Sequence, residues 1–433
     1  MEEKKPVIEE NSPASRRAFL RRSAAAVVGA GVASSVRAGY VDGSDTLRIG
    51  LVGCGGRGTG AAAQALRADP NTRLVAMADA FADQLDKSLV NLGQSEDVSS
   101  RVRVAKDHCF VGFDAYQQLL SSDVDVVLLA TPTHFRPIHV RACLEAGKHV
   151  FAEKPVAVDA PGIRSILESA QLAKQKNLSL VSGLCWRYET GMQKTIRQIH
   201  QGALGDLVTI ESTRFNGFSR TAPRSPGDTD MYWQMRNWYN FTWLSGDFIV
   251  EQFVHELDKI AWLMKDQNPI RCVATGGRQT RIGEANGNIY DHFSAVFEYE
   301  NGVKHFAATR QQPRCSSEFI DLVFGTQGRA NLMEYSITGQ APWQWPHERT
   351  DMHQLEHNAM YKALRKGEVI NNGEYMAKST LLGIMARMSA YTGKTLTWEE
   401  ALNSQESLSP ETYAWDAKPP ASPVSMPGET LFV

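Results

Sequence analysis

Three glycines near the start of the chain are spaced for contact with phosphate groups. Gly53, Gly55 and Gly58 fit the pattern G-x-G-x-x-G, and they follow an apolar segment, 47–52, that is typical of a buried strand. In such a turn the first glycine permits a tight bend, the second lets the backbone approach a pyrophosphate, and the third lets helix and strand pack closely. The following helix offers unpaired N–H groups to the phosphates. We therefore expect a dinucleotide to contact Gly53, Gly55, Gly56, Arg57 and Gly58.

A second apolar segment, 73–78, ends on Asp79, about 20 residues beyond the last of these glycines. A carboxylate at this point can accept hydrogen bonds from the ribose hydroxyls of adenosine, and it would repel a 2′-phosphate. The sequence thus favours NAD, while the nearby cation of Arg57 keeps NADP as an alternative.

Glu251 and His255 form a candidate acid–base pair. Apolar residues recur at helical spacing over 250–264, which predicts one continuous helix with both polar side chains at the edge of its apolar face. Residues i and i+4 are neighbours on a helix, so the carboxylate could orient the imidazole and raise its basicity. Histidine also titrates near neutral pH. The alternative is a purely structural histidine at the helix edge that is hydrogen-bonded to a neighbouring carboxylate.

The elements that must position these residues alternate between strands and helices. Apolar strands are expected at 125–130 and 149–152, inside a parallel sheet that is covered on both faces. Alternating patterns farther along indicate strands of a second sheet, with turns between them. These strands are expected at 207–214, 292–299, 303–309 and 319–324.

Together these segments resemble the Gfo/Idh/MocA family, which includes glucose–fructose oxidoreductase and inositol dehydrogenase. The resemblance implies an α/β fold, with an N-terminal Rossmann domain at 46–156 and a C-terminal α/β domain at 157–402. The second domain would contain an open, mostly antiparallel sheet that commonly forms the oligomer interface. A tail at 403–433 would follow. The motifs that carry the resemblance are GCGGRG at 53–58, Asp79, TPTH at 131–134, AGKHVFAEKP at 146–155 and GALGDLVTI at 202–210.

The resemblance also implies roles for individual residues. Lys154 of the EKP motif would lie beside the nicotinamide and the substrate hydroxyl, where an ammonium group can stabilise a developing alkoxide. A surface lysine paired with Glu153 is the alternative. The family usually has aspartate where this chain has Glu251, so the reach of the longer side chain is in question. Further cofactor contacts would be Thr131, Pro132, His134, Glu153 and Lys154, and substrate contacts would be Arg187, Tyr188 and Asp258.

Other clusters suggest weaker hypotheses. The segment 231–243 is rich in aromatic residues, which stack on sugars or anchor a core equally well, and Arg236, Trp238 and Tyr239 are its candidate substrate contacts. His353 and His357 lie at i and i+4 near Glu356, but no third ligand follows at a recognisable spacing. We therefore expect structural histidines and no metal.

Composition and the N-terminus narrow the class of protein. The 433 residues include 46 basic and 48 acidic side chains, and the net charge of −2 argues against a protein that neutralises nucleic-acid phosphates. Residues 1–38 resemble a twin-arginine export signal, with Arg16-Arg17 before a short apolar stretch. We expect a periplasmic homo-dimer or homo-tetramer, exported folded, with no membrane span in the mature protein.

Two enzyme functions fit these features, and both retain NAD because the periplasm has no large NAD pool. The first is an oxidoreductase that acts on a hydroxyl of a sugar, polyol or glycoside. The second is a redox-neutral glycoside hydrolase or lyase that works through a keto-sugar, with Tyr188 or Tyr239 as the extra base. A non-enzymatic nucleotide-loaded sensor would require Lys154 or His255 to point away from the cofactor.

Overall fold

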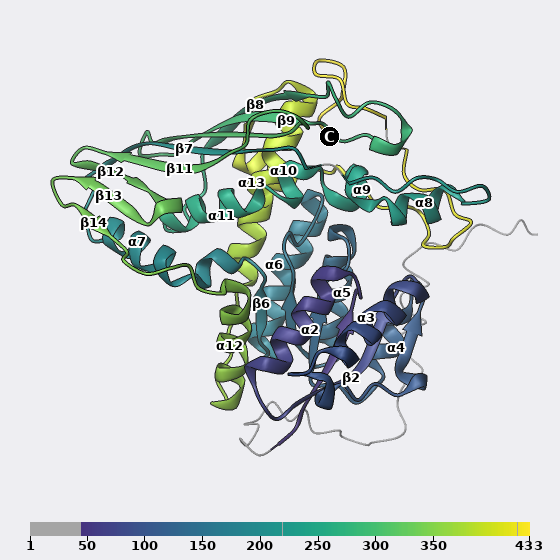
Figure 1. Ribbon diagram of the computed structural model, residues 1–433. Helices are drawn as coiled ribbons and strands as arrows, with labels where there is room; N and C mark the ends of the chain where they lie inside the picture. Colours follow the sequence, from purple (N-terminus) through teal and green to yellow (C-terminus); the bar gives the residue numbers. More distant parts are fainter. Residues whose placement is uncertain (1–44, 219, 422) are drawn as a thin grey trace, which may run out of the picture. The chain divides into compact units, whose positions relative to one another are not determined.

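The first half of the protein is built on a six-stranded parallel sheet in the order β3-β2-β1-β4-β5-β6 (Figure 1). The computed structural model describes residues 45–218, 220–421 and 423–433, so the predicted signal at 1–38 lies outside the described residues. The strands are β1 (Leu47–Val52), β2 (Thr72–Asp79), β3 (Cys109–Val111), β4 (Val126–Leu129), β5 (His149–Ala152) and β6 (Leu180–Ser182).

Helices cover both faces of this sheet because its central strands are apolar on both sides. In β4, Leu128 packs in one hydrophobic cluster with residues of α2 and α3, while Val127 and Leu129 pack in another with residues of α4, α5 and α6. β6 extends the sheet to Ser182, beyond the predicted domain boundary at 156. The helices are α2 (Gly56–Ala68), α3 (Ala82–Gln94), α4 (Ala115–Leu120), α5 (Arg136–Glu145) and α6 (Ala160–Gln175).

The second half contains a nine-stranded sheet in the order β14-β13-β12-β11-β7-β10-β9-β8-β15, in which only β7 and β10 pair in parallel. This is the open, mostly antiparallel sheet that the resemblance implied. The strands are β7 (Leu207–Asn216), β8 (Arg271–Gly277), β9 (His292–Glu298), β10 (Lys304–Gln311), β11 (Glu318–Gly325), β12 (Gly328–Asn331), β13 (Ser336–Gly339), β14 (Trp343–Gln344) and β15 (Leu396–Thr397).

One face of the second sheet is covered by helices, and the other is exposed. Figure 1 shows α7 (Thr190–His200), α11 (Val254–Leu263) and α13 (Gly373–Thr392) on the same side of the sheet. Alternate residues such as Ile210 and Ala307 are buried on that side, while Phe306 is 47% exposed. Val208 and Val273 are also exposed apolar residues. Among the described residues, no helix is both long enough and apolar enough to span a membrane.

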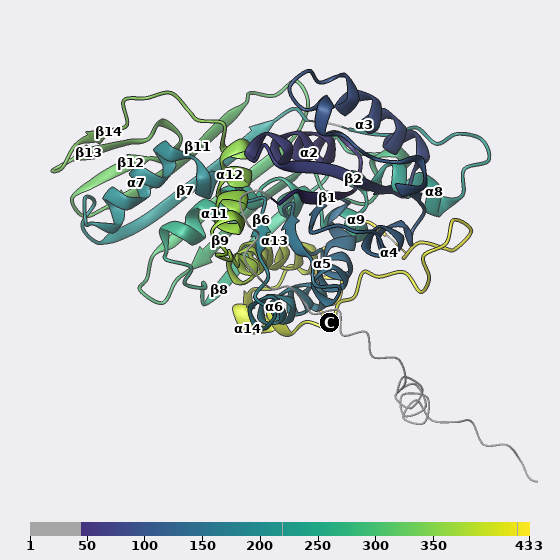
Figure 2. The same ribbon diagram turned by 90° about the horizontal axis from the view of Figure 1, so that it is seen from below.

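Helices from the last third of the chain return to the first sheet. α12 (Met352–Arg365) contributes Met360, Tyr361 and Leu364 to the cluster beneath α2, and α13 contacts both α6 and β8. Figure 2 shows α12 beside α2 and β6. Three further α-helices are α8 (Asp230–Arg236), α9 (Thr242–Ser245) and α14 (Trp398–Asn403).

The single helix predicted over 250–264 is two helices, which is a correction to the sequence analysis. α10 (Phe248–Glu251) ends before α11 begins at Val254. α10 is started by a tight turn in which Asp247 has a φ of +75° and is fully buried. The Asp247 carboxylate accepts hydrogen bonds from the backbone N–H of Phe248 (2.5 Å) and Tyr290 (2.9 Å) and from the hydroxyl of Tyr391 (2.5 Å). These contacts fix where α10 begins. The break itself lies at residues 252–253, where the N–H of Phe253 donates to the carbonyl oxygen of Phe248 (3.1 Å), five residues back.

We expect the substitution Asp247→Gly to lower the free energy of unfolding by about 2–4 kcal/mol, because three buried donors lose their acceptor. Glycine tolerates the positive φ, so backbone strain does not contribute. Urea denaturation measures the change. Asn177→Gly, at φ +53° on an exposed residue, is the control. Equal, small effects of the two substitutions would show that the hydrogen bonds of Asp247 do not stabilise this turn.

Candidate active site

The glycine turn after β1 has the conformation that close contact with a ligand requires. Gly53 has a φ of +94°, and a Cβ atom on it would lie 2.6 Å from the backbone nitrogen of Thr131. A Cβ on Gly58 would lie 1.8 Å from the carbonyl oxygen of Gly53, so only glycine fits where α2 meets β1. Around Gly55 the corresponding space is open within 4 Å. A phosphate group can approach the backbone from this open side.

Helix α2 begins at this turn, and no described side chain caps its first N–H groups. Its first turn also contains no acidic residue, so an anion is favoured there. At the end of β2, Asp79 accepts hydrogen bonds from the backbone N–H of Cys54 (2.6 Å) and Phe81 (2.9 Å). These bonds fix the carboxylate where an adenosine ribose would lie. The residues present therefore fit NAD.

One cavity joins the glycine turn to the carboxyl ends of β2 and β4. The structure places Thr131 and Pro132 in its wall, together with Gly53, Gly55, Gly56, Arg57 and Asp79. The second half of the chain closes the opposite side with Arg220, Met235, Arg236 and Trp238.

Arg236 and Trp238 were predicted as substrate contacts, but the structure places them at this cofactor cavity. Arg236 forms an ion pair with Asp83 (2.5 Å), and its guanidinium lies 3.8 Å from the centre of the Phe81 ring. Phe81 and Asp83 follow directly after β2 in the sequence. Their contacts with Arg236 therefore place α8 against the end of that strand. Arg236 is therefore beside Asp79 rather than beside Lys154.

Three predicted cofactor contacts are engaged within the protein. The Arg57 guanidinium forms an ion pair with the buried Glu153 and donates to Gln64 (2.9 Å). Burial raises the pKa of Glu153, but the charge and hydrogen bond of Arg57 and the charges of Lys154 and Arg136 together outweigh burial, so that pKa lies below its usual range. His134 is buried, with its Nε2 2.8 Å from the hydroxyl of Tyr413, and burial lowers its pKa to about 4. Arg57 is thus not free for a 2′-phosphate, and His134 serves the packing of the C-terminal tail.

Lys154 links the two halves of the molecule. It follows β5, and its Nζ donates a hydrogen bond to the carbonyl oxygen of Glu251 (2.8 Å) and lies 3.2 Å from Glu251 Oε1. The Lys154 side chain as a whole is 17% exposed. Among the described residues, Glu251 makes no hydrogen bond to His255. The predicted Glu251–His255 pair is therefore replaced by a Glu251–Lys154 pair, because the break between α10 and α11 turns the carboxylate toward β5.

His255 lies in the first turn of α11 and is partly exposed. Its Nδ1 atom is buried and has no hydrogen-bond partner among the described residues. Burial, and next the positive charge of Lys154, hold its pKa well below the usual range for histidine. The imidazole is therefore neutral at physiological pH and can accept a proton.

The other predicted substrate contacts are occupied. Arg187 pairs with the buried Asp258 (2.9 Å) and with Asp266 (2.7 Å), and Asp258 also accepts from Ser379 (2.8 Å). The hydroxyl of Tyr188 donates to Asn372 (3.1 Å). Tyr239 is buried, and its hydroxyl accepts a hydrogen bond from Gln311 (2.8 Å). The polar groups of Arg187, Tyr188, Tyr239 and Asp258 are thus all hydrogen-bonded or ion-paired within the protein.

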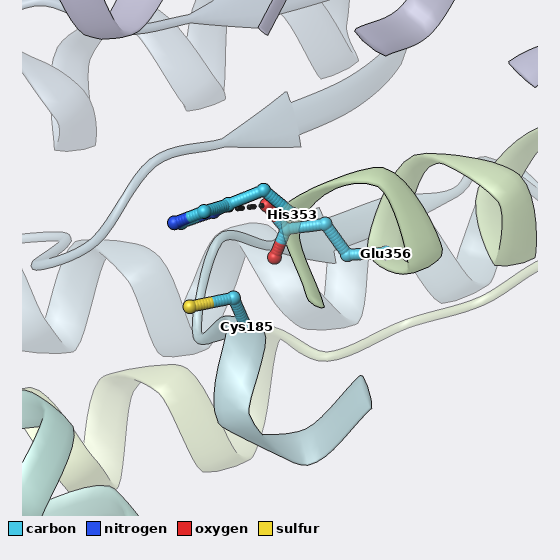
Figure 3. Close-up of side chains that lie close together, drawn as sticks. All are labelled: Cys185, His353 and Glu356. Atoms are coloured by element: carbon cyan, nitrogen blue, oxygen red, sulfur yellow. Dashed lines mark hydrogen bonds and ion pairs between the residues drawn. The ribbon is translucent and has the colours of Figure 1, made fainter. Parts of the chain in front are cut away.

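The sequence analysis singled out His353 and Glu356 but missed Cys185, which completes a cluster beside Arg57. His353 and Glu356 of α12 lie close to Cys185, which begins the short helix η4 (Cys185–Tyr188) (Figure 3). Glu356 is fully buried, and its Oε1 lies 3.6 Å from Arg57 Nη2. Because Cys185 lies far from α12 in the sequence, no local spacing could reveal this cluster. His357, by contrast, is buried with its ring centre 4.2 Å from that of Phe151.

The sequence comparisons were made with curated proteins. A protein from Streptococcus pneumoniae described as an uncharacterized oxidoreductase is 29% identical over 51% of this chain, and the match covers 56% of that protein, little more than half its length. An inositol 2-dehydrogenase from Burkholderia lata is 26% identical over 68% of this chain and 76% of its own. A protein from a Shewanella species named glycosyl hydrolase family 109 protein 2 is 29% identical over 46% of this chain and 45% of its own.

Solved structures share the fold. The apo scyllo-inositol dehydrogenase of Lactobacillus casei superimposes with a TM-score of 0.60 at 18% identity, covering 82% of this chain and 99% of that one. GenD2 from gentamicin A biosynthesis, solved in complex with NAD, gives a TM-score of 0.61 at 16% identity, covering 83% and 98%.

Two family profiles match adjacent parts of the chain. Residues 47–183 match the NAD-binding Rossmann fold of the GFO/IDH/MocA oxidoreductase family, and residues 192–331 match a C-terminal domain of the same family. The two matches together span more than half of the chain. They coincide with the parallel sheet and with most of the antiparallel sheet. The chain therefore belongs to the Gfo/Idh/MocA family of NAD-binding oxidoreductases.

Proposed function

We propose that this protein is an NAD-dependent oxidoreductase that oxidises a secondary hydroxyl of a sugar, polyol or cyclitol. The observation that carries the proposal is the partly exposed Lys154 side chain, whose ammonium group is fixed by Glu251 at the end of β5. The neutral His255 lies near enough for the Lys154 charge to lower its pKa. The inositol dehydrogenases among the relatives support a polyhydroxylated ring as the substrate class.

The chemistry divides between two side chains. Lys154 donates a hydrogen bond to the substrate hydroxyl oxygen and stabilises the negative charge that grows there. His255 accepts the proton that this hydroxyl loses, which a neutral imidazole can do. Glu251 positions Lys154, as their 2.8 Å and 3.2 Å contacts indicate. Bound NAD supplies the acceptor for the hydride that leaves the carbinol carbon.

We expect Lys154→Met and His255→Gln each to lower kcat by at least about 100-fold, since each removes a group that acts on the reacting oxygen. NAD binding should change by less than about threefold, because neither residue lines the cavity around the glycine turn. Reduced-nicotinamide formation with myo-inositol and a panel of sugars measures turnover. Lys148→Met is the control. Near wild-type turnover of either variant would contradict its assigned role.

We propose NAD rather than NADP as the cofactor, because Asp79 faces the ribose position and Arg57 is bound to Glu153. Replacing Asp79 by asparagine keeps the side-chain shape and removes the charge. We expect this change to weaken NAD binding about tenfold and to reduce the ratio of NAD affinity to NADP affinity, because a charged hydrogen-bond acceptor is lost. Calorimetric titration of both nucleotides measures the two affinities. Equal binding of NAD and NADP by the wild-type protein would contradict this assignment.

We propose that the C-terminal segment 405–433 helps to retain the cofactor. Trp415 packs on Phe81 (5.2 Å between ring centres) and Phe113 (4.4 Å), which both line the cavity. Its carbonyl oxygen accepts a hydrogen bond from Thr229, which caps α8. The end of the segment is held by the bond from the N–H of Gln405 to the carbonyl oxygen of Val433 (2.9 Å). The segment therefore contacts the cavity wall, through Phe81 and Phe113, and also the start of α8, through Thr229.

The substitution Trp415→Ala should speed NAD dissociation about tenfold or more, because two wall residues lose an aromatic neighbour. Stopped-flow release of NAD from the loaded protein measures this rate. Trp345→Ala removes a tryptophan that contacts His347, away from the cavity, and should leave the rate unchanged. Equal release rates in the two variants would exclude a retaining role for Trp415.

The twin-arginine motif at 16–17 and cofactor retention together support export of the loaded, folded protein to the periplasm. The exposed apolar residues Val273 and Phe306 support assembly into a dimer or tetramer through the open sheet face. Cell fractionation and light scattering test these two proposals. A cytoplasmic protein, or a monomer at micromolar concentration, would contradict the respective proposal.

A redox-neutral glycoside hydrolase is the second candidate, favoured by the similarity to the family 109 protein. Such a reaction needs an additional base, and the tyrosines proposed for it are engaged. Burial raises the pKa of both Tyr188 and Tyr239 above the usual range for tyrosine. Incubation with aryl glycosides separates the candidates: cleavage without lasting reduction of the cofactor identifies the hydrolase, and reduction without cleavage identifies the oxidoreductase.

A further inference from the structure

Cys185, His353 and Glu356 bring three different metal-ligating groups together beside the candidate active site. One ligand atom from each residue lies within 4.8 Å of the other two. Figure 3 shows the imidazole and the carboxylate reaching from α12 toward the thiol at the start of η4. The two elements are far apart in sequence, so the tertiary fold itself assembles the cluster.

The hydrogen bonds within the protein do not account for this arrangement. Glu356 is fully buried, and its Oε2 atom has no hydrogen-bond partner among the described residues. Its Oε1 atom lies 3.3 Å from His353 Nδ1. Cys185 is buried, and its sulfur makes no hydrogen bond in the described part of the chain. A buried carboxylate oxygen without a partner requires a proton or a cation.

The neighbouring arginine forms an ion pair with Oε1 of Glu356 but leaves Oε2 without a hydrogen-bond partner among the described residues. Arg57 directs its Nε to Glu153 and its Nη1 to Gln64. Only its Nη2 approaches Glu356, at 3.6 Å, which is too far for a good hydrogen bond. Lys154, which follows Glu153 in the sequence, is paired with Glu251. The Arg136 guanidinium is also buried in this region, but it donates to the carbonyl oxygens of Thr131 and Pro155 and to the hydroxyl of Thr133.

We propose that Cys185, His353 and Glu356 bind one divalent metal ion of the zinc type. A thiolate, an imidazole and a carboxylate are all ligands that zinc takes, and three protein ligands with a water molecule in the fourth position are typical of an open zinc site. The thiolate and the carboxylate would neutralise the ion. Both ligand-bearing residues of α12 lie outside the two regions that match the family, which end at residue 331.

The geometry requires a small adjustment when the ion binds. Bonds of about 2.0–2.3 Å place neighbouring ligand atoms of a tetrahedral site roughly 3.5 Å apart, so the side chains must close by about 1 Å. His353 can make this movement, because its side chain is 36% exposed and lies in the first turn of α12. Cys185 and Glu356 are fixed by burial.

Cobalt titration of the purified full chain tests the proposal without reference to activity. After treatment with a chelator and dialysis, addition of Co²⁺ should produce visible bands of tetrahedral cobalt and a near-ultraviolet thiolate charge-transfer band, saturating at one equivalent. Zinc should abolish these bands by competition. Weak octahedral cobalt absorption, or saturation only at a large excess of the ion, would overturn the proposal.

Variants assign the ligands. Cys185→Ser should remove the charge-transfer band and weaken zinc binding by at least about 100-fold, and His353→Gln should weaken it comparably. Cys143→Ser, at another buried cysteine, is the control and should bind like the wild type. Circular dichroism and thermal melting identify variants that fail to fold, and Glu356→Gln then provides a third ligand test. An unchanged cobalt spectrum in folded Cys185→Ser protein would overturn the proposal, whatever the outcome of the oxidoreductase assays.

Discussion

The ion pair between Lys154 and Glu251 is the interaction on which the arrangement of the site depends. It connects the end of β5 with the end of α10, and so fixes the candidate catalytic ammonium against the second half of the chain. Both groups are largely buried, so each requires a partner, and removing one would leave the other charge uncompensated. The turn at Asp247 starts α10 and thereby sets where Glu251 stands.

Paired charges also arrange the rest of the site. Lys154 and Arg57, two cations at the carboxyl edge of the parallel sheet, each have a fixed acidic partner, Glu251 and Glu153 respectively. The cationic surroundings and burial together keep His255 neutral. The glycine turn contributes no side chain to this charge pattern and leaves the start of α2 uncapped for phosphate. The ion pair of Arg57 with Glu153, the residue before Lys154, therefore connects the candidate anion site with the candidate catalytic lysine.

The features that depend on short stretches of sequence were predicted correctly. The glycine spacing, the apolar strands and the alternating strands led to the fold class and to the dinucleotide turn. Long-range contacts could not be read in the same way. Glu251 reaches Lys154 because the helix is interrupted at 252–253, and Arg187 is engaged by Asp258. Likewise, Arg236 lies at the cofactor cavity because α8 rests on the end of β2, and His353 reaches the site from a helix near the end of the chain.

The most direct test of this account is an NMR titration of His255 in the wild-type protein and in a Lys154→Met variant. Burial and the Lys154 charge lower the pKa of His255, so the account predicts a wild-type pKa well below 6.5 and an upward shift when the charge is removed. The proton-accepting form is then fully populated at neutral pH and is lost only as the pH falls through this lowered pKa. A wild-type pKa near 6.5 that is insensitive to Lys154 would contradict the account.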